Sequence, residues 1–165
     1  MNAPFYNRRS FLMSAGLVSA GLVSVGAGLG PMGAWASTYA PTQSMRGGSN
    51  NYRPNAPMVD KLGDGFFVRG KVVRAGDGAA LQNVRIQIWA ATVLGGEREP
   101  RNHGSVLTGP GGLFELEMEQ IVPNFGQPHA HLAYDDSQFK TVFLRPVMPS
   151  ASDTSVTADF VLAPA

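Results

Sequence analysis

The sequence predicts an all-β fold, a β-sandwich of about seven short strands. In several short runs, apolar residues occupy every second position, which is the period of a strand with one buried face. Turn-forming residues, above all Gly, Pro and Asp, separate these runs. No segment of ten or more residues spaces its apolar residues like a helix. Two sheets that bury their apolar faces against each other satisfy these patterns.

The expected strands follow one another after the first third of the chain. In chain order they are residues 68–72, residues 84–89, a strand that begins at Ser105, residues 114–119, a strand around residues 129–134, residues 140–144 and residues 156–162. Asp77-Gly78 is a turn sequence between the first two strands. Val84, Ile86 and Ile88 share one face of their strand, so we expect these three side chains in the core.

The first 36 residues are expected to be an export signal and not part of the fold. Arg8-Arg9 precedes a mildly apolar stretch of Gly, Ala and Ser, as in twin-arginine signals. Ala34-Trp35-Ala36 has the small residues of a cleavage site. We therefore predict cleavage after Ala36 and a periplasmic location reached through the twin-arginine export machinery. No stable membrane insertion is expected after cleavage.

The remaining chain divides into an arm and one domain. Residues 37–58 are rich in Asn, Gly, Ser, Pro and Gln, and we expect them to form an extended arm without a core of its own. The alternating pattern begins after this segment, so residues 59–165 are predicted to form the sandwich domain.

Composition excludes several kinds of function. The chain has no cysteine, which rules out disulfides, thiolate metal sites and cysteine nucleophiles. Without Arg8 and Arg9, 11 of the 13 basic residues remain against 12 acidic residues. This balance gives no support for nucleic-acid binding or for a basic membrane-binding patch.

Two histidines separated by one residue, His129 and His131, are the leading candidates for a binding site. Residues i and i+2 of a strand point to the same face, so two imidazoles in this spacing can bind one metal ion. Leu132 and Tyr134 then face the packed interior. The pair predicts a metal site, and the alternative is an exposed strand that carries two histidines for no chemical purpose.

A series of short motifs between about Tyr52 and Leu144 resembles the intradiol ring-cleavage dioxygenases, the catechol and protocatechuate type. In the order of that family they are Asn51-Tyr52-Arg53-Pro54, Gly70-Lys71-Val72 with Leu81-Gln82-Asn83-Val84, Ile86-Gln87-Ile88-Trp89, Leu107-Thr108-Gly109-Pro110-Gly111-Gly112-Leu113-Phe114, Ile121-Val122-Pro123 and Pro128-His129-Ala130-His131. The last of these is similar to the Pro-His-x-His motif that carries two iron ligands. The resemblance implies a transthyretin-like or immunoglobulin-like β-sandwich.

The resemblance also implies a cofactor and a reaction. In that family two histidines and two tyrosinates hold one ferric iron, Fe(III), to which a catecholate binds through both oxygens. The ring then opens between the hydroxyl-bearing carbons, and both atoms of O2 are incorporated. His129 and His131 correspond to the two histidine ligands. Copper or zinc are the alternative metals for such a site.

The sequence departs from this pattern at the tyrosine positions. The two segments where the family has its tyrosines, residues 92–97 and 123–127, contain none. Glu97, near the first of these positions, and His103, just before a strand, are candidates for further metal ligands, and the alternative for both is an exposed loop residue. Tyr52 would reach the metal if the arm folds back, and Tyr134 if its strand contains a bulge.

The sequence and this resemblance leave two candidate functions open. The first is an exported non-haem iron oxidoreductase of the intradiol dioxygenase-like group that acts on catecholic aromatics. The second is a non-catalytic, transthyretin-like module of the periplasm that binds a metal or a small aromatic ligand. No catalytic residue is assigned, and the sequence leaves the oligomeric state open.

Overall fold

The computed structural model describes residues 39–148 and 150–165. The predicted export signal, residues 1–36, and the first residues of the predicted arm therefore lie outside the described residues. Within the described part of the chain, no helix is long and apolar enough to cross a membrane.

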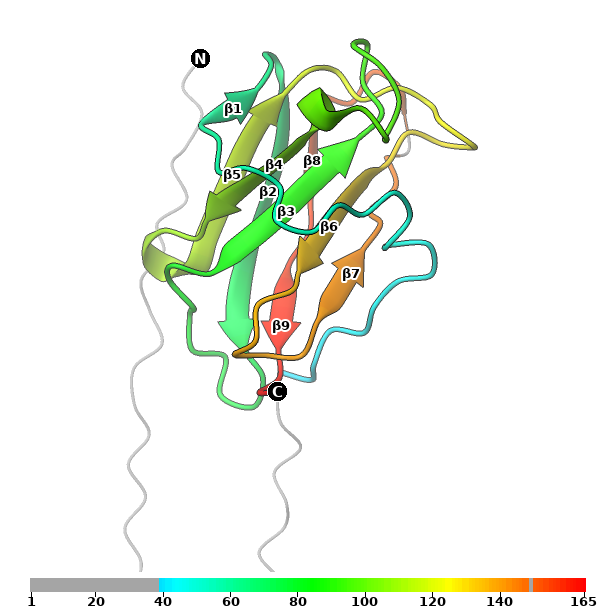
Figure 1. The fold of residues 1–165 in the computed structure, drawn as a ribbon. Coiled ribbons are helices and arrows are strands. Elements are labelled where there is room, and N and C mark those ends of the chain that lie inside the picture. Colours follow the sequence, from blue (N-terminus) through cyan, green and yellow to red (C-terminus); the bar gives the residue numbers. More distant parts are fainter. Residues whose placement is uncertain (1–38, 149) are drawn as a thin grey trace, which may run out of the picture. The chain divides into compact units, whose positions relative to one another are not determined.

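The described residues form two β-sheets that face each other, which confirms the predicted all-β sandwich (Figure 1). One sheet has the strand order β1 (Lys61–Leu62), β5 (Leu113–Met118), β2 (Phe66–Arg74) and β8 (Ser155–Thr157), and β9 (Phe160–Leu162) pairs with the far end of β2. The other sheet has the order β4 (His103–Leu107), β3 (Arg85–Ala90), β6 (Ala130–Tyr134) and β7 (Val142–Leu144). Within residues 39–148 and 150–165, helical structure is limited to two short 3-10 turns, η1 (Pro100–Asn102) and η2 (Pro110–Gly112).

Each strand expected from the alternating pattern is present. The structure adds the two-residue strand β1, and it divides the last expected strand into β8 and β9, which both run parallel to β2. The division falls at Ala158, whose amide donates to the carbonyl oxygen of Arg69. Gly70 is required there, since a Cβ atom at this position would lie 1.9 Å from the Ala158 carbonyl oxygen.

The core lies between the two sheets. Val84, Ile86 and Ile88 are buried in it, with 8%, 0% and 0% of their surface exposed, as the sequence predicted. On the neighbouring strand, Leu132 and Tyr134 fill the same interior. Because side chains alternate along a strand, the residues between them project from the outer face of the sheet.

The register of β3 with its two neighbours brings three aromatic rings together on that outer face. Trp89 is paired with His103 of β4 on one side and with His131 of β6 on the other. The indole ring of Trp89 lies nearly parallel to both imidazoles, with centroid distances of 5.8 Å to His103 and 5.1 Å to His131. The three rings therefore form a stack across β4, β3 and β6.

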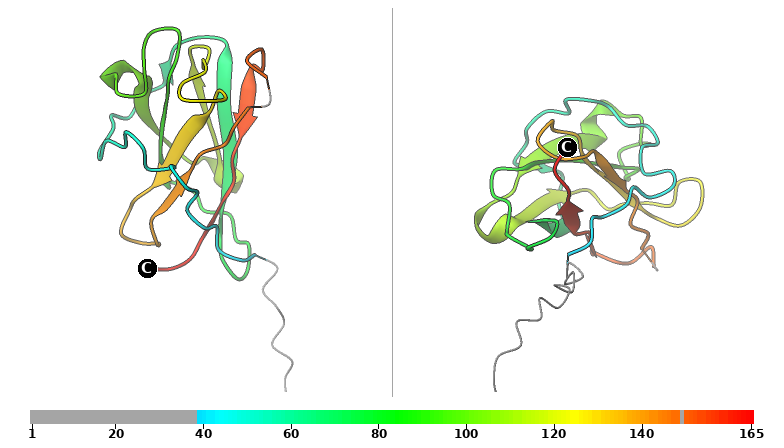
Figure 2. Two further views of the ribbon diagram at one scale, coloured as in Figure 1. Left: turned by 90° about the vertical axis from the view of Figure 1, so that its right-hand side faces the viewer. Right: turned by 90° about the horizontal axis from the view of Figure 1, so that it is seen from below.

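The arm covers this outer face. Residues 39–58 cross the β4–β3–β6–β7 sheet on the side away from β2 and β5 (Figures 1 and 2). Gln87 illustrates the contact: its side-chain oxygen accepts from the amide of Ala56, and its side-chain nitrogen donates to the hydroxyl of Tyr52. The outer face is consequently buried even though it carries polar side chains, and the arm supplies their hydrogen-bond partners.

Candidate metal centre

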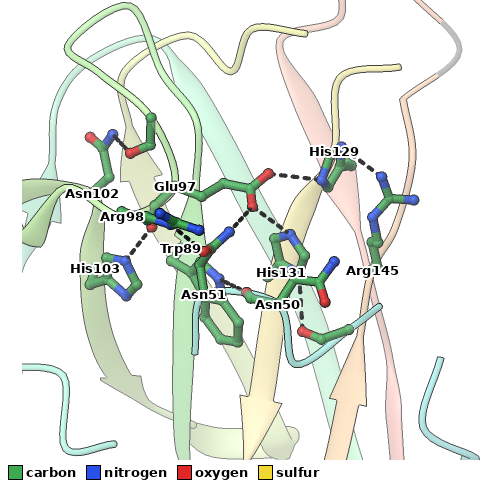
Figure 3. Close-up of polar contacts among 12 residues, drawn as sticks. Asn50, Asn51, Trp89, Glu97, Arg98, Asn102, His103, His129, His131 and Arg145 are labelled. Carbon is green, nitrogen blue, oxygen red and sulfur yellow. Dashed lines mark hydrogen bonds and ion pairs between the residues drawn. The ribbon is translucent and has the colours of Figure 1, made fainter. Parts of the chain in front are cut away.

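Three buried side chains converge at one end of the β4–β3–β6–β7 sheet (Figure 3). Glu97 comes from the loop after β3, His131 from β6, and His129 from the residue just before β6. Glu97 Oε1 lies 2.9 Å from His129 Nε2, and Glu97 Oε2 lies 3.4 Å from His131 Nε2. One ligand atom from each residue can be chosen so that all three lie within 4.8 Å of one another.

Backbone carbonyl groups orient both histidines. His129 Nδ1 lies 2.8 Å from the carbonyl oxygen of Gln127, and His131 Nδ1 lies 3.0 Å from that of Gly48. A carbonyl oxygen only accepts, so Nδ1 of His131 carries the proton and donates it to Gly48. Nε2 of His131 then presents a lone pair toward Glu97, which is the tautomer that a metal ligand requires.

The carboxylate of Glu97 is held in its charged form. Burial raises the pKa of Glu97. Hydrogen bonds from the side chains of Asn124 and Asn51, together with the nearby His131 and His129, lower the pKa by more than burial raises it, so the net pKa is below the ordinary value. Asn51 Nδ2 donates to Glu97 Oε2 over 2.7 Å. The site therefore contains a buried negative charge.

The Nε2 lone pair of His131 lacks a hydrogen-bond partner in this cluster. His131 Nε2 is buried and has no hydrogen-bond donor, because the nearest group, the carboxylate of Glu97, is also an acceptor. Burial lowers the pKa of His131, although its bond to Gly48 acts in the opposite direction. The lowered pKa favours the neutral ring. Buried acceptors that face one another without a donor are costly. A metal ion bound between them removes that cost, so the residues present fit a metal.

The loop that carries Glu97 is fixed by the side chain of Asn102, which follows Glu97 in the chain. The side chain of Asn102 donates to the carbonyl oxygens of Gly95 and Gly96, and it accepts from the hydroxyl of Thr92. Gly95 has a φ of 141°, a conformation that glycine adopts without strain. These bonds hold the backbone on the N-terminal side of Glu97.

His103 lies outside the ligand set, although the sequence made it a candidate ligand. Its Nε2 donates to the backbone carbonyl oxygen of Glu97 over 2.6 Å, and its ring stacks on the side of Trp89 away from His131. The strand register is the physical reason, since the whole indole ring separates the two imidazoles. His103 supports the Glu97 loop from behind.

Neither candidate tyrosine belongs to the ligand set. Tyr134 is buried in the core on the other face of β6, where its hydroxyl accepts from the amide of Phe139. Tyr52 does fold back with the arm, but its hydroxyl donates to Asp135 and its ring packs on Trp89 and Phe143. The structure therefore offers one carboxylate where the resemblance implies two tyrosinates.

A cavity of about 300 Å³ opens beside Glu97 and His129. Its other lining residues are mostly polar or cationic: Asn50, Asn51, Asn124, Arg98 and Arg145, with Phe125 as the one aromatic residue. Arg145 lies 3.3 Å from His129 Nδ1. A larger hollow of about 580 Å³ lies over β2 and β5, and we do not assign it a function because it contains none of the three converging residues.

Sequence reasoning missed the residues that surround the ligands. Asn51 and Gly48 belong to the predicted arm, and Asn124 and Arg145 carry no motif that marks them. Asn51 lies in the Asn51-Tyr52-Arg53-Pro54 motif. That motif indicated an arm and did not indicate that the arm reaches the site.

Comparison with solved structures relates the fold to 1,2-dioxygenases. The 3-chlorocatechol 1,2-dioxygenase of Rhodococcus opacus 1CP is similar in structure, and the matched region covers 69% of this chain and 70% of the dioxygenase chain, with 17% identity and a TM-score of 0.53. For the dioxygenase domain of a dioxygenase carbohydrate-binding protein fusion from Streptomyces sp. SirexAA-E, the matched region covers 76% of this chain and 99% of that domain, with 19% identity and a TM-score of 0.57. For hydroxyquinol 1,2-dioxygenase from Pseudomonas putida DLL-E4, the matched region covers 78% of this chain and 68% of the dioxygenase chain, with 13% identity and a TM-score of 0.55.

These likenesses define the class of fold. No family model matches the sequence. No curated protein sequence matches it either. The chain has the β-sandwich fold of the intradiol 1,2-dioxygenases, which confirms that part of the expected resemblance, and it carries a Glu97–His129–His131 cluster in that fold.

Proposed function

We propose that the protein is an exported, mononuclear non-haem iron protein of the intradiol dioxygenase-like group that binds catecholic aromatics and oxidises them slowly. The observation that carries this proposal is the buried cluster of Glu97, His129 and His131, in which Nε2 of His131 faces the Glu97 carboxylate without a hydrogen-bond donor. Two histidines and one carboxylate are the ligands typical of non-haem iron oxygenases, and they also suit catalytic zinc.

Charge favours divalent iron at this site over the ferric iron implied by the resemblance. Two tyrosinates and two neutral histidines reduce the charge of a ferric ion from +3 to +1. One carboxylate and two neutral histidines leave the same +1 on a divalent ion. Because Glu97 is the single anionic residue in the cluster, we propose Fe(II) as the resident metal. Zinc and copper are the competing metals.

The protein's own residues define what the site does with a ligand. A bound iron ion would supply a Lewis acid and a redox centre for dioxygen chemistry. The carbonyl groups of Gly48 and Gln127 lie within hydrogen-bond distance of Nδ1 of the two imidazoles and orient Nε2 of each ring toward Glu97. Arg98 and Arg145 line the adjacent cavity and favour an anionic ligand such as a catecholate.

Metal analysis tests the proposed site. Metal-free protein is incubated anaerobically with Fe(II), Zn(II) or Cu(II), dialysed and analysed for bound metal. We expect one equivalent in the wild type and none in His129→Ala or His131→Ala, with circular dichroism to show that both variants fold. Wild-type protein that stays metal-free with all three ions would refute the site.

Ligand binding and turnover then separate the two candidate functions. Catechol binding to the metal-loaded protein is titrated, and oxygen uptake is measured with catechol and protocatechuate. Slow turnover supports the oxidoreductase. Binding without turnover supports the non-catalytic, transthyretin-like module, which the missing tyrosine ligands also favour. A tyrosinate-to-iron absorption band would contradict the proposed ligand set.

The location belongs to the proposal as well. The proposed export rests on the sequence of Arg8-Arg9, a weakly apolar stretch and Ala34-Trp35-Ala36. We expect a variant with Arg8→Lys and Arg9→Lys to stay in the cytoplasm uncleaved, as judged by fractionation and intact mass. Periplasmic appearance of this double variant at wild-type levels would count against twin-arginine export.

A further inference from the structure

The arm contacts the candidate metal centre through one short segment, residues 47–53, which we call the arm turn. The carbonyl oxygen of Gly48 accepts from Nδ1 of His131 at 3.0 Å, and Nδ2 of Asn51 donates to Oε2 of Glu97 at 2.7 Å. The carbonyl oxygen of Asn50 accepts from Nε1 of Trp89, the residue on which His131 stacks. Two of the three candidate ligands, and the ring behind one of them, thus depend on the arm turn (Figure 3).

We propose that the arm turn is a positioning element of the metal site, so that metal binding and docking of the arm stabilise each other. This inference rests on the proposed metal site. The Gly48 carbonyl keeps the proton of His131 on Nδ1 and leaves Nε2 free for the metal. The amide of Asn51 holds the carboxylate of Glu97 in the direction of the two imidazoles.

The backbone of the arm turn is built for this approach. A Cβ atom at Gly48 would lie 2.9 Å from the backbone carbon and oxygen of Phe143 in β7, so only glycine lets the arm come this close to the sheet. Asn51 has a φ of 56°, a left-handed conformation that asparagine tolerates better than most residues. Its side-chain oxygen accepts from Arg98 Nε, which ties the arm turn to the residue after Glu97.

Docking of the arm turn relies mainly on polar contacts, and its apolar contact is the ring of Tyr52 on Trp89 and Phe143. Gly48 is its one buried residue, and Ser49, Asn50 and Arg53 are exposed. Segments with few buried apolar contacts open at low free-energy cost. An open arm would leave His131 and Glu97 without their partners, and outer partners of metal ligands contribute about 10- to 100-fold in metal affinity. By thermodynamic reciprocity, saturating metal should favour the docked arm by the same factor.

Two asparagines in the arm allow a matched test. Asn51→Gly removes the bond to Glu97 and the bond from Arg98, and glycine keeps the positive φ without strain. Asn55→Gly is the control, because Asn55 has a similar φ of 60°, is exposed and has no contact with the candidate ligands among the described hydrogen bonds. Zn(II) affinity is measured by competition with a chelator in full-length protein. We expect a 10- to 100-fold loss for Asn51→Gly and none for Asn55→Gly.

Hydrogen exchange provides a readout that a purely structural role would leave unchanged. Exchange of residues 47–53 is followed by mass spectrometry with and without Zn(II). We expect saturating metal to slow exchange there by about 10- to 100-fold in the wild type, and to have no effect in His131→Ala. Co(II) is then substituted, and its visible spectrum should change in Asn51→Gly but not in Asn55→Gly.

The outcomes separate this inference from the proposed site. If the wild type binds metal, but Asn51→Gly retains full affinity and metal does not slow exchange in the arm turn, the positioning role is wrong and the metal site stands. If the wild type binds no metal, both fail. Equal loss of affinity in Asn51→Gly and Asn55→Gly would reduce the arm to a general stabilising element and would also overturn the inference.

Discussion

Glu97 is a candidate metal ligand, whereas His103 supports the backbone of Glu97. The side chain of Glu97 faces the two histidines, and its backbone carbonyl oxygen accepts from His103. A ligand is lost outright when it is replaced, whereas loss of a supporting residue only loosens the ligand. The two residues should therefore behave differently in metal titrations.

We expect His103→Ala to keep one equivalent of metal and to lose about 10-fold in affinity, as outer partners of ligands do. Glu97→Gln should lose stoichiometric binding, because the amide removes the only negative charge of the cluster. Isothermal titration with Zn(II) distinguishes the two. Metal-free His103→Ala, correctly folded by circular dichroism, would make His103 a ligand after all.

Phe125 lines the cavity beside the candidate centre, and its ring is almost fully exposed. It is 95% exposed, has a φ of 50° and lines the cavity beside Glu97. Left-handed backbone is uncommon for a bulky residue, and such strain is frequent where a ligand is held. An exposed ring contributes little to stability, so its contribution should lie in ligand binding.

We expect Phe125→Ala to weaken catechol binding to the metal-loaded protein by about 2- to 10-fold, the value of one aromatic pair. Metal affinity should not change, and the free energy of unfolding should stay within about 0.5 kcal/mol of the wild type. Phe125→Tyr is the matched control and should bind catechol normally. Unchanged affinity in Phe125→Ala would exclude the ring from the ligand site.

Strand β3 is the element on which both the core and the site depend. Its inner face contributes Ile86 and Ile88 to the core, and its outer face carries Gln87 and Trp89, which contact the arm. The same strand pairs with β4 and β6, which carry His103 and His131. A change in its packing should therefore destabilise the whole sandwich.

Replacing Ile86 with alanine is expected to lower the free energy of unfolding by about 2–4 kcal/mol, since it opens a cavity in a fully buried position. Urea titration followed by fluorescence measures the change. Leu107→Ala in β4 is the control, because half of the Leu107 side chain is exposed, and it should cost much less. Equal effects from both substitutions would contradict the assigned core.

At the scale of the whole molecule, two tyrosines link stability to alkaline pH. Burial raises the pKa of Tyr134 above 10.0, and burial together with Asp135 raises that of Tyr52. An acid with a raised folded pKa binds its proton more tightly in the folded state. Its contribution to stability is complete below the unfolded pKa of 10.0 and is lost as the pH rises through the folded pKa.

The free energy of unfolding should therefore fall as the pH rises from 9 toward 11, in urea titrations performed across that range. Tyr134→Phe should be less stable than the wild type at pH 8, because the amide of Phe139 loses its acceptor. Its decline above pH 10 should be shallower. A decline equally steep in the wild type and Tyr134→Phe would remove Tyr134 from this linkage.

The alternating pattern was sufficient to predict the sandwich, because it depends only on which side chain faces the core at each strand position. The same parity placed Tyr134 inside and His131 outside, and the structure confirms both positions. It could not predict that the last strand divides at Ala158, since that depends on a backbone contact with β2.

The sequence by itself determined the strands, the core face and the histidine pair, all of which are local patterns. Only the tertiary structure decided that Glu97 joins that pair, that His103 stays behind Trp89, and that the arm lies over the site. The physical reason is separation along the chain. The bond from Asn51 to Glu97 spans 46 residues, and the bond from His131 to Gly48 spans 83. No local pattern encodes such contacts, which form only when the strand register and the path of the arm are both in place.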